Sequence, residues 1–145
     1  MRDEVTKFLF VDDDIVSLER FKRFLNKAGI ENLVVSAVDG IEALDILRGH
    51  GDHEKLHHPF LVILDLSMPR MNGIEFLDVV RNDPDLKGIV VYIMTTSDSQ
   101  IDIDAALQGG ADGFFMKDQA DVGFMQAIVK SKALSDQMVK RPAGT

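Results

Sequence analysis

Short apolar runs that each end in a polar or charged side chain are the feature that most constrains the fold of this chain. The side chains that follow these runs are, in chain order, Asp12 with Asp13, then Asp65, Thr95 and Lys117. In an open parallel sheet the carboxyl ends of the strands lie along one edge, which is where ligands bind. The pattern therefore predicts three carboxylates, a hydroxyl and an ammonium group on one edge of a sheet.

Helical patterns alternate with these runs, which is typical of a parallel sheet with helices on both faces. The strands are expected at about 7–12, 33–37, 60–65, 89–94 and 113–116. Five helices are expected. The first ends at Gly29, and the second runs from the cap Asp39 to about Arg48. The other three run from near Asn72 to before Pro84, from the cap Ser99 to Gly109-Gly110, and from about Ala120 to Lys140. The fold class is therefore α/β, with a doubly wound five-stranded parallel sheet.

Length and composition indicate one domain and exclude several classes of protein. The 145 residues are expected to form one unit over 1–145, with a core at about 7–134 and a loose tail at 141–145. The absence of cysteine excludes disulfides and favours the cytoplasm. No apolar run approaches the roughly 20 residues of a membrane helix. The net charge of −8 argues against binding to nucleic acid or to an anionic membrane.

The predicted edge has the chemistry of phosphoryl transfer to a carboxylate. Clustered carboxylates repel one another unless a cation is present, and Mg²⁺ takes one or two carboxylates while leaving room for phosphate oxygens. An ionised Asp65 is able to act as the nucleophile and form an aspartyl-phosphate. Lys117 and the Thr95 hydroxyl are suited to stabilise the transferring oxygens. No general base is needed, because the nucleophile is already an anion.

The stretch from about Lys7 to Leu134 resembles a response-regulator receiver domain of two-component signalling. The matching pieces are Val11-Asp12-Asp13, Leu64-Asp65 with Met68-Pro69 and Gly73, Thr95 thirty residues after Asp65, and Gly110 to Phe114 leading to Lys117. The family is one in which the strand order 2-1-3-4-5 occurs. The resemblance therefore implies a flavodoxin-like order and a signalling switch that modifies itself, in place of an enzyme with a separate substrate.

The resemblance also implies a role for each site residue. Asp65 is the expected phosphoacceptor, and its expected donor is a phosphohistidine on a sensor histidine kinase or a phosphotransfer protein. The expected ligands of Mg²⁺ are Asp65, Asp13 directly, Asp12 through water, and the main-chain carbonyl of Ser67. Thr95 and Lys117 are expected to hold the phosphoryl oxygens, and Phe114 to act as an aromatic switch. The surface formed by the fourth helix, fifth strand and fifth helix is then expected to change and to contact a downstream protein.

Two features separate this chain from a minimal receiver. Asp118 follows Lys117, at a position where many relatives have a proline that forms a cis bond. The loop 49–58 is longer than usual and resembles the loop of stand-alone receivers that partner phytochrome-type kinases. No output domain is expected after the receiver. A homodimer through the fourth and fifth helices is a further expectation.

Other interpretations stay open at this stage. A module of the same fold that binds partners without phosphorylation is one alternative. A phosphatase of the haloacid-dehalogenase type is another, although such enzymes need an Asp where this chain has Ser67. Some residues also have simpler explanations: Asp14 is expected to cap the first helix, Asp102 and Asp104 to be solvated, and one of Phe114 and Phe115 to face inward while the other faces the last helix. The histidines at 50, 53, 57 and 58 are expected to be solvated rather than to bind metal.

Overall fold

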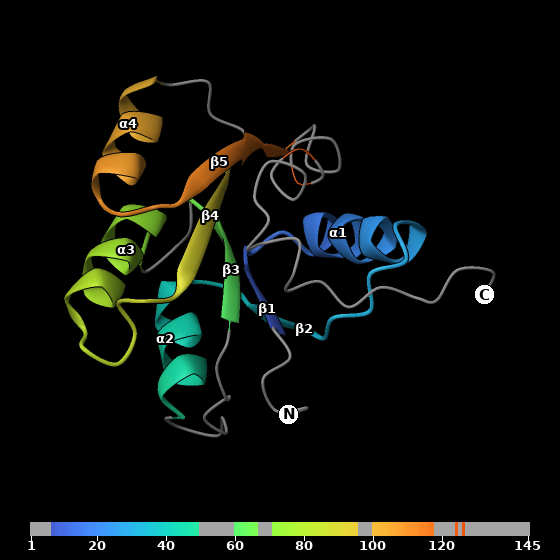
Figure 1. Cartoon of the computed structure of the whole chain (residues 1–145), viewed down its shortest axis with the longest axis horizontal. Helices are drawn as coiled ribbons and strands as arrows, with labels where there is room; N and C mark the ends of the chain where they lie inside the picture. The colour runs from blue at the N-terminus through green and yellow to red at the C-terminus, as the bar shows by residue number, and fades with distance from the viewer. Residues whose placement is uncertain are drawn as a thin grey trace.

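The computed structural model describes residues 7–49, 60–66, 71–95 and 100–117, together with Phe124 and Gln126. Five parallel strands form one sheet in the order β2-β1-β3-β4-β5 (Figure 1). The strands are β1 (Lys7–Val11), β2 (Val34–Ala37), β3 (Phe60–Asp65), β4 (Val90–Thr95) and β5 (Gly113–Met116). The helices in the described part are α1 (Ile15–Lys27), α2 (Gly40–Arg48), α3 (Gly73–Asn82) and α4 (Gln100–Gln108). The predicted fold class and strand order are confirmed.

Helices cover both faces of the sheet, and alternate residues of the strands supply two separate apolar layers. In Figure 1, α1 lies on one side of the sheet, while α2 and α3 lie on the other. In β1, Leu9 and Val11 pack with α2 and α3, whereas Phe8 and Phe10 pack with α1. This alternation follows from the two-residue period of a strand. Because β1 and β3 are covered on both faces, their sequences are apolar throughout.

An aromatic cluster fills the layer beneath α1. The ring of Phe21 lies edge-on to Phe8 and is stacked on Phe10, with centroid distances of 5.4 and 5.0 Å. Phe124, which lies in helical backbone and is fully buried, joins the same cluster through Phe21 and Phe115. Such contacts add to the burial of the rings. Part of the segment beyond β5 is therefore anchored against α1 and the sheet.

Side-chain caps fix the starts of the three helices that follow β1, β2 and β3. Asp14 caps α1 by accepting from the amide of Val16, as predicted. Asp39 caps α2 in the same way. Three residues into this helix, the Glu42 carboxylate reaches back and accepts from the amide of Val38. A complete capping box is present at Asn72, at the start of α3.

Several predicted boundaries move by one or two residues. β1 ends at Val11, β2 begins at Val34 and β4 covers Val90–Thr95, so Thr95 is the last residue of its strand and does not follow it. The α1 helix ends at Lys27, and Gly29 adopts the left-handed conformation expected of a glycine after a helix. The predicted cap Ser99 lies outside the described residues. The same is true of the predicted helix from Ala120 to Lys140, except at Phe124 and Gln126.

Arg81 of α3 holds the turn that leads into β5. Its guanidinium donates to the carbonyl of Gly110, with distances of 2.9 and 2.7 Å, and to the carbonyl of Ile89. Asp112 accepts from the same guanidinium and from the amide of Val91, and its own amide donates to the Val91 carbonyl. A planar group with several donors suits this task. The entry to the short edge strand β5 is therefore fixed from α3 and β4.

No helix in the described part is long and apolar enough to cross a membrane.

The close contact between the end of β3 and the start of α3 gives a test of the fold. A Cβ atom at Gly73 would lie 2.9 Å from the carbonyl oxygen of Asp65 and from the Cα of Leu66. We expect Gly73→Ala to lower the free energy of unfolding by about 1–3 kcal/mol, because backbone atoms must move to relieve the overlap. Urea unfolding followed by circular dichroism measures this.

Gly88→Ala is the matched control, since a Cβ atom at that position meets nothing within 4 Å. It is expected to change the free energy of unfolding by less than about 0.5 kcal/mol. Equal stability of the two variants would show that β3 and α3 are not packed this closely.

Candidate functional site

The carboxyl edge of the sheet brings the predicted polar residues together. Asp65 ends β3, and its partner across the β3–β4 ladder is Met94, so Thr95 extends one residue further along the edge. Thr95 is in turn paired with Met116, which Lys117 follows. Asp12 follows β1 and donates its amide to the carbonyl of Ala37. The register of the parallel strands therefore places these residues side by side.

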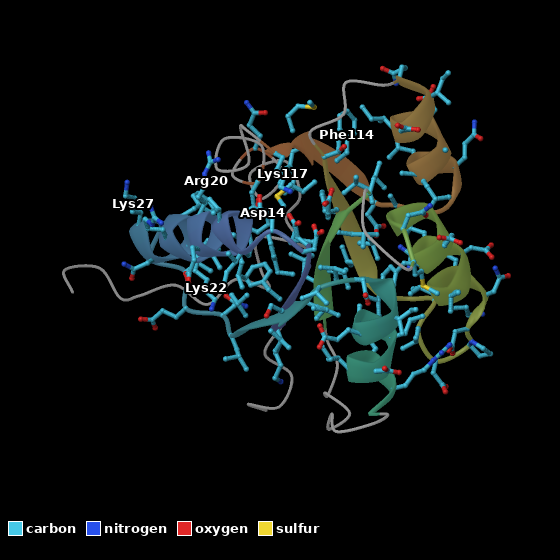
Figure 2. The ribbon with its side chains drawn as sticks, turned by 180° about the vertical axis from the view of Figure 1, so that it is seen from behind. Asp14, Arg20, Lys22, Lys27, Phe114 and Lys117 are labelled. Atoms are coloured by element: carbon cyan, nitrogen blue, oxygen red, sulfur yellow. The ribbon has the colours of Figure 1, made fainter. Side chains whose placement is uncertain are left out.

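Lys117 lies among the carboxylates of this edge. Its Nζ atom is 2.7 Å from Oδ2 of Asp12, 3.7 Å from Oδ2 of Asp65 and 4.0 Å from Oδ2 of Asp14. Figure 2 shows Asp14 and Lys117 next to each other, where the start of α1 meets the end of β5. Asp12 and Asp65 are buried, each with 6% of its surface exposed. One partly buried ammonium group therefore contacts two buried carboxylates and one at the surface.

The protonation of Lys117 follows from its surroundings. Burial alone would lower its pKa, but the carboxylate of Asp12, followed by those of Asp65 and Asp14, raises the pKa of Lys117 above its usual value. The ammonium form therefore persists through the neutral range. Asp14 is held ionised by different contacts: the Ser17 hydroxyl and the Val16 amide lower its pKa. The N-terminus of α1 thus keeps a negative charge beside Lys117.

Three carboxylates of this site form a group of the kind that holds a metal ion. One oxygen each from Asp12, Asp13 and Asp65 lies within 4.8 Å of the others, and the Asp13 side chain is exposed to solvent. Asp12 uses Oδ1 to accept from the amide of Asp14. Its Oδ2 is buried and lies 2.7 Å from Nζ of Lys117. Three acids with one ammonium leave excess negative charge, and a hard divalent cation fits such a set of oxygen donors.

Two phenylalanines of β5 and two acids of α4 differ in how far they are exposed to solvent. Phe114 is 44% exposed, while Phe115 is buried and contacts Phe124. The prediction that one of the pair faces inward is confirmed for Phe115. The other half of the prediction, that the second ring faces the last helix, falls mostly on residues outside the described part. The opposite exposure of the two side chains follows from the alternation of a strand, whose odd and even side chains point to opposite faces. Asp102 and Asp104 are exposed, as predicted.

Three groups of predicted residues lie outside the described part: Ser67, Asp118 and the histidine loop 50–58. Sequence reasoning also missed Arg81, whose partners are mainly main-chain carbonyls. Carbonyl partners carry no side-chain signal, so no pattern of residue types predicts them.

The comparison with known proteins decides the family. The family model of the response regulator receiver domain matches residues 8–129. The chain belongs to the response regulator receiver family. This receiver is 31% identical over 100 residues to the response regulator Rcp1 of Synechocystis sp., covering 69% of this chain and 68% of Rcp1.

Solved receiver structures share the fold over most of their length. The bacteriophytochrome response regulator AtBRR is 29% identical, with a TM-score of 0.78, and the match covers 98% of this receiver and 99% of that chain. The phosphorylated cyanobacterial phytochrome response regulator RcpA is 27% identical, with a TM-score of 0.74 and coverage of 86% and 88%. The Mn²⁺-bound form of Rcp1 is 28% identical, with a TM-score of 0.75 and coverage of 94% and 98%.

Removal of the Lys117 charge tests the electrostatics of this receiver site. In buffer without divalent cations at neutral pH, we expect Lys117→Met to lower the free energy of unfolding by about 1–2 kcal/mol. This loss is smaller than the loss expected when a fully buried ion pair is broken, because Lys117 is partly exposed. Urea unfolding measures it. The exposed Lys87→Met, which removes the same charge far from the acids, is the control and should have little effect.

The pH dependence of this deficit follows from linkage. The raised pKa of Lys117 means that its own contribution is complete below the ordinary lysine pKa and is lost as the pH rises through the raised value. The deficit of the variant should therefore shrink as the pH rises through that raised value. A deficit that stays constant would show that Lys117 does not balance these acids.

Proposed function

We propose that this receiver is a phosphorylation switch in which Asp65 accepts a phosphoryl group from a phosphohistidine. The observation that carries the proposal is the buried carboxylate of Asp65 at the carboxyl edge, beside Asp12 and 3.7 Å from the ammonium of Lys117. Nucleophile, charge stabiliser and acidic ligands are thus in one place. The phosphorylated state of the related RcpA supports the same chemistry here.

The transfer step is balanced without a general base. An oxygen of the ionised Asp65 carboxylate forms a bond to phosphorus, while the phosphorus–nitrogen bond to the donor imidazole breaks and its electron pair stays on the nitrogen. Lys117 and the hydroxyl of Thr95 would hold the phosphoryl oxygens, whose charge they stabilise. Since Lys117 already lies between Asp12 and Asp65, a small movement of its flexible side chain suffices.

The acidic group would hold Mg²⁺ during this reaction. Asp12, Asp13 and Asp65 are the proposed ligands, together with the main-chain carbonyl of Ser67, which lies outside the described residues. The Mn²⁺-bound form of the related Rcp1 supports a divalent ion in this place. When bound, the ion neutralises negative charge on the phosphoryl group and on the acids. This offsets the repulsion that opposes the approach of a phosphate to three carboxylates.

Mass spectrometry after incubation with a small acyl phosphate tests the proposal. With Mg²⁺ present, we expect a gain of one phosphoryl group, and Asp65→Asn should abolish it because an amide is not a nucleophile of this kind. Without Mg²⁺, the gain should fall strongly. Asp78→Asn, an exposed change on α3, is the control that should behave like the parent chain. Normal labelling of the Asp65 variant would exclude Asp65 as the acceptor.

The proposed physiological donor is a sensor histidine kinase of the phytochrome type or a phosphotransfer protein. The support comes from the relatives, because RcpA is a phytochrome response regulator and AtBRR a bacteriophytochrome response regulator. A second arm of the labelling experiment compares transfer from a purified phytochrome-type kinase with transfer from a chemotaxis-type kinase. A receiver that takes label from neither kinase while binding Mg²⁺ normally would favour the alternative, a binding module that works without phosphorylation.

The proposed switch couples Asp65 to the exposed side of β5. Thr95 is buried at the end of β4, and Phe114 on the neighbouring strand is 44% exposed. On phosphorylation, Thr95 would move towards the phosphoryl group and the Phe114 ring would turn into the space that it leaves. The surface formed by α4, β5 and the last helix would then differ between the two states. This is the surface through which we expect the downstream protein to bind.

A tryptophan reporter tests this movement, since the chain contains no tryptophan. We expect the fluorescence of Phe114→Trp to shift to shorter wavelength when beryllofluoride, which mimics the phosphoryl group, is added with Mg²⁺, because the ring leaves solvent. The double variant Phe114→Trp with Asp65→Asn is the control and should not respond. An unchanged spectrum in a receiver whose beryllofluoride binding is verified by fluorine NMR would contradict the switch.

The same samples test the proposed homodimer. Ile101 and Leu107 of α4 and Phe114 of β5 are exposed apolar side chains, which leaves apolar surface for a second copy. Sedimentation velocity with and without beryllofluoride is expected to show dimers in the activated state. Monomers in both states would remove the dimer from the mechanism without affecting the switch.

A further inference from the structure

Helix α1 carries a concentration of positive charge in an acidic chain. Between Ile15 and Lys27 it has four basic residues and one acidic residue, whereas the whole chain has a net charge of −8. Arg20, Arg23 and Lys27 follow one another at spacings of three and four residues, so they form a stripe along one side of the helix. Lys22 is also basic but does not belong to this stripe. The stripe is not part of the apolar face, which is formed by Phe21 and Leu25.

This stripe forms one wall of a cavity of about 200 Å³. The described lining residues are Ser17, Arg20, Phe21, Arg23, Phe24, Lys27, Met94 and Lys117. Figure 2 shows Arg20 and Lys27 on the side of α1 that faces Lys117, and Lys22 on the opposite side. The cavity therefore begins beside the acidic site and extends along α1.

The charged side chains among the described lining residues of the cavity are all positive. The described lining contains four basic side chains and no acid, and within the described residues no ion pair joins Arg20, Arg23 or Lys27 to a carboxylate. Like charges three and four residues apart on a helix repel each other. Attraction to the carboxyl end of the helix compensates for Lys27 in the last turn, but it does not reach Arg20 in the middle. An anion in the cavity would remove this repulsion.

We propose that this cavity binds a small oligophosphate, that is, an anion with two or more linked phosphate groups. Arginine side chains bind phosphate oxygens through two parallel hydrogen bonds, and two arginines with a lysine match a multiply charged anion. Phe21, Phe24 and Met94 supply an apolar wall, beside which charged contacts are stronger than in open water. The volume is below the usual range for a drug-sized ligand, roughly 300–1,000 Å³, so the bound part is compact.

Calorimetric titration with pyrophosphate tests this proposal on the full chain. The buffer contains no divalent cation, so that the acidic site has no metal through which to attract phosphate. We expect measurable binding that Arg23→Gln weakens by about tenfold, the loss of roughly one charge-assisted hydrogen-bonded contact. The adjacent Lys22→Gln removes the same charge from the same helix outside the cavity, and should alter the dissociation constant by less than about twofold.

Three results would overturn the proposal. They are the absence of binding, equal weakening by the two variants, and pyrophosphate-induced amide shifts that lie outside α1 and the end of β5 in NMR spectra. Circular dichroism of both variants confirms that they fold. The titration contains no phosphoryl donor, and none of its variants alters Asp65, so its outcome is independent of the proposed phosphorylation. ADP as a second probe distinguishes the source: tighter binding than pyrophosphate indicates a nucleotide, and weaker binding indicates a free oligophosphate.

Discussion

The ammonium group of Lys117 is the interaction on which this receiver site depends. Two buried carboxylates side by side would repel each other and oppose folding if no cation were near. Lys117, 2.7 Å from Asp12 and 3.7 Å from Asp65, balances part of that charge within the chain itself. The two acids can therefore lie together at the edge of the sheet before a metal ion binds. The charge that remains uncompensated is what a divalent ion would neutralise.

The position of Lys117 is in turn fixed by parts of the fold that do not touch the site. It follows β5, a strand of four residues that lies at the edge of the sheet and is hydrogen-bonded to another strand on one side only. Arg81 secures the turn before this strand, and the ring of Tyr92 packs so closely over Gly113 that a Cβ atom there would lie 2.8 Å from it. The layer that contains α3 thus positions a side chain that acts at the far end of β5.

Much of the fold was predictable because its signals are local. Apolar runs gave the five strands, and short polar side chains at Asp14, Asp39 and Asn72 gave the helix starts, since a cap acts within three residues. The site could be assembled from the sequence because parallel strands share one edge. The orientation of Phe114 could not be predicted, because it depends on which face of an edge strand is covered. The hydrogen bonds of Arg81 could not be predicted either, because its acceptors are carbonyl groups distant in the chain. The cationic cavity could not be predicted for the same reason, because Met94 and Lys117 are distant from α1 in the sequence and lie beside it only in the folded chain.

Lys117 connects two neighbouring sites of opposite charge, which has a physical consequence for both. On one side it is drawn to Asp12, and on the other it forms the end of the basic cavity along α1. A divalent cation among the acids would compete with Lys117 for Asp12 and so release part of its charge towards an anion in the cavity. The same linkage requires that an anion in the cavity favours the cation by an equal factor. The two sites are therefore expected to bind cooperatively, although their ligands have opposite signs and share no atom other than those of one lysine.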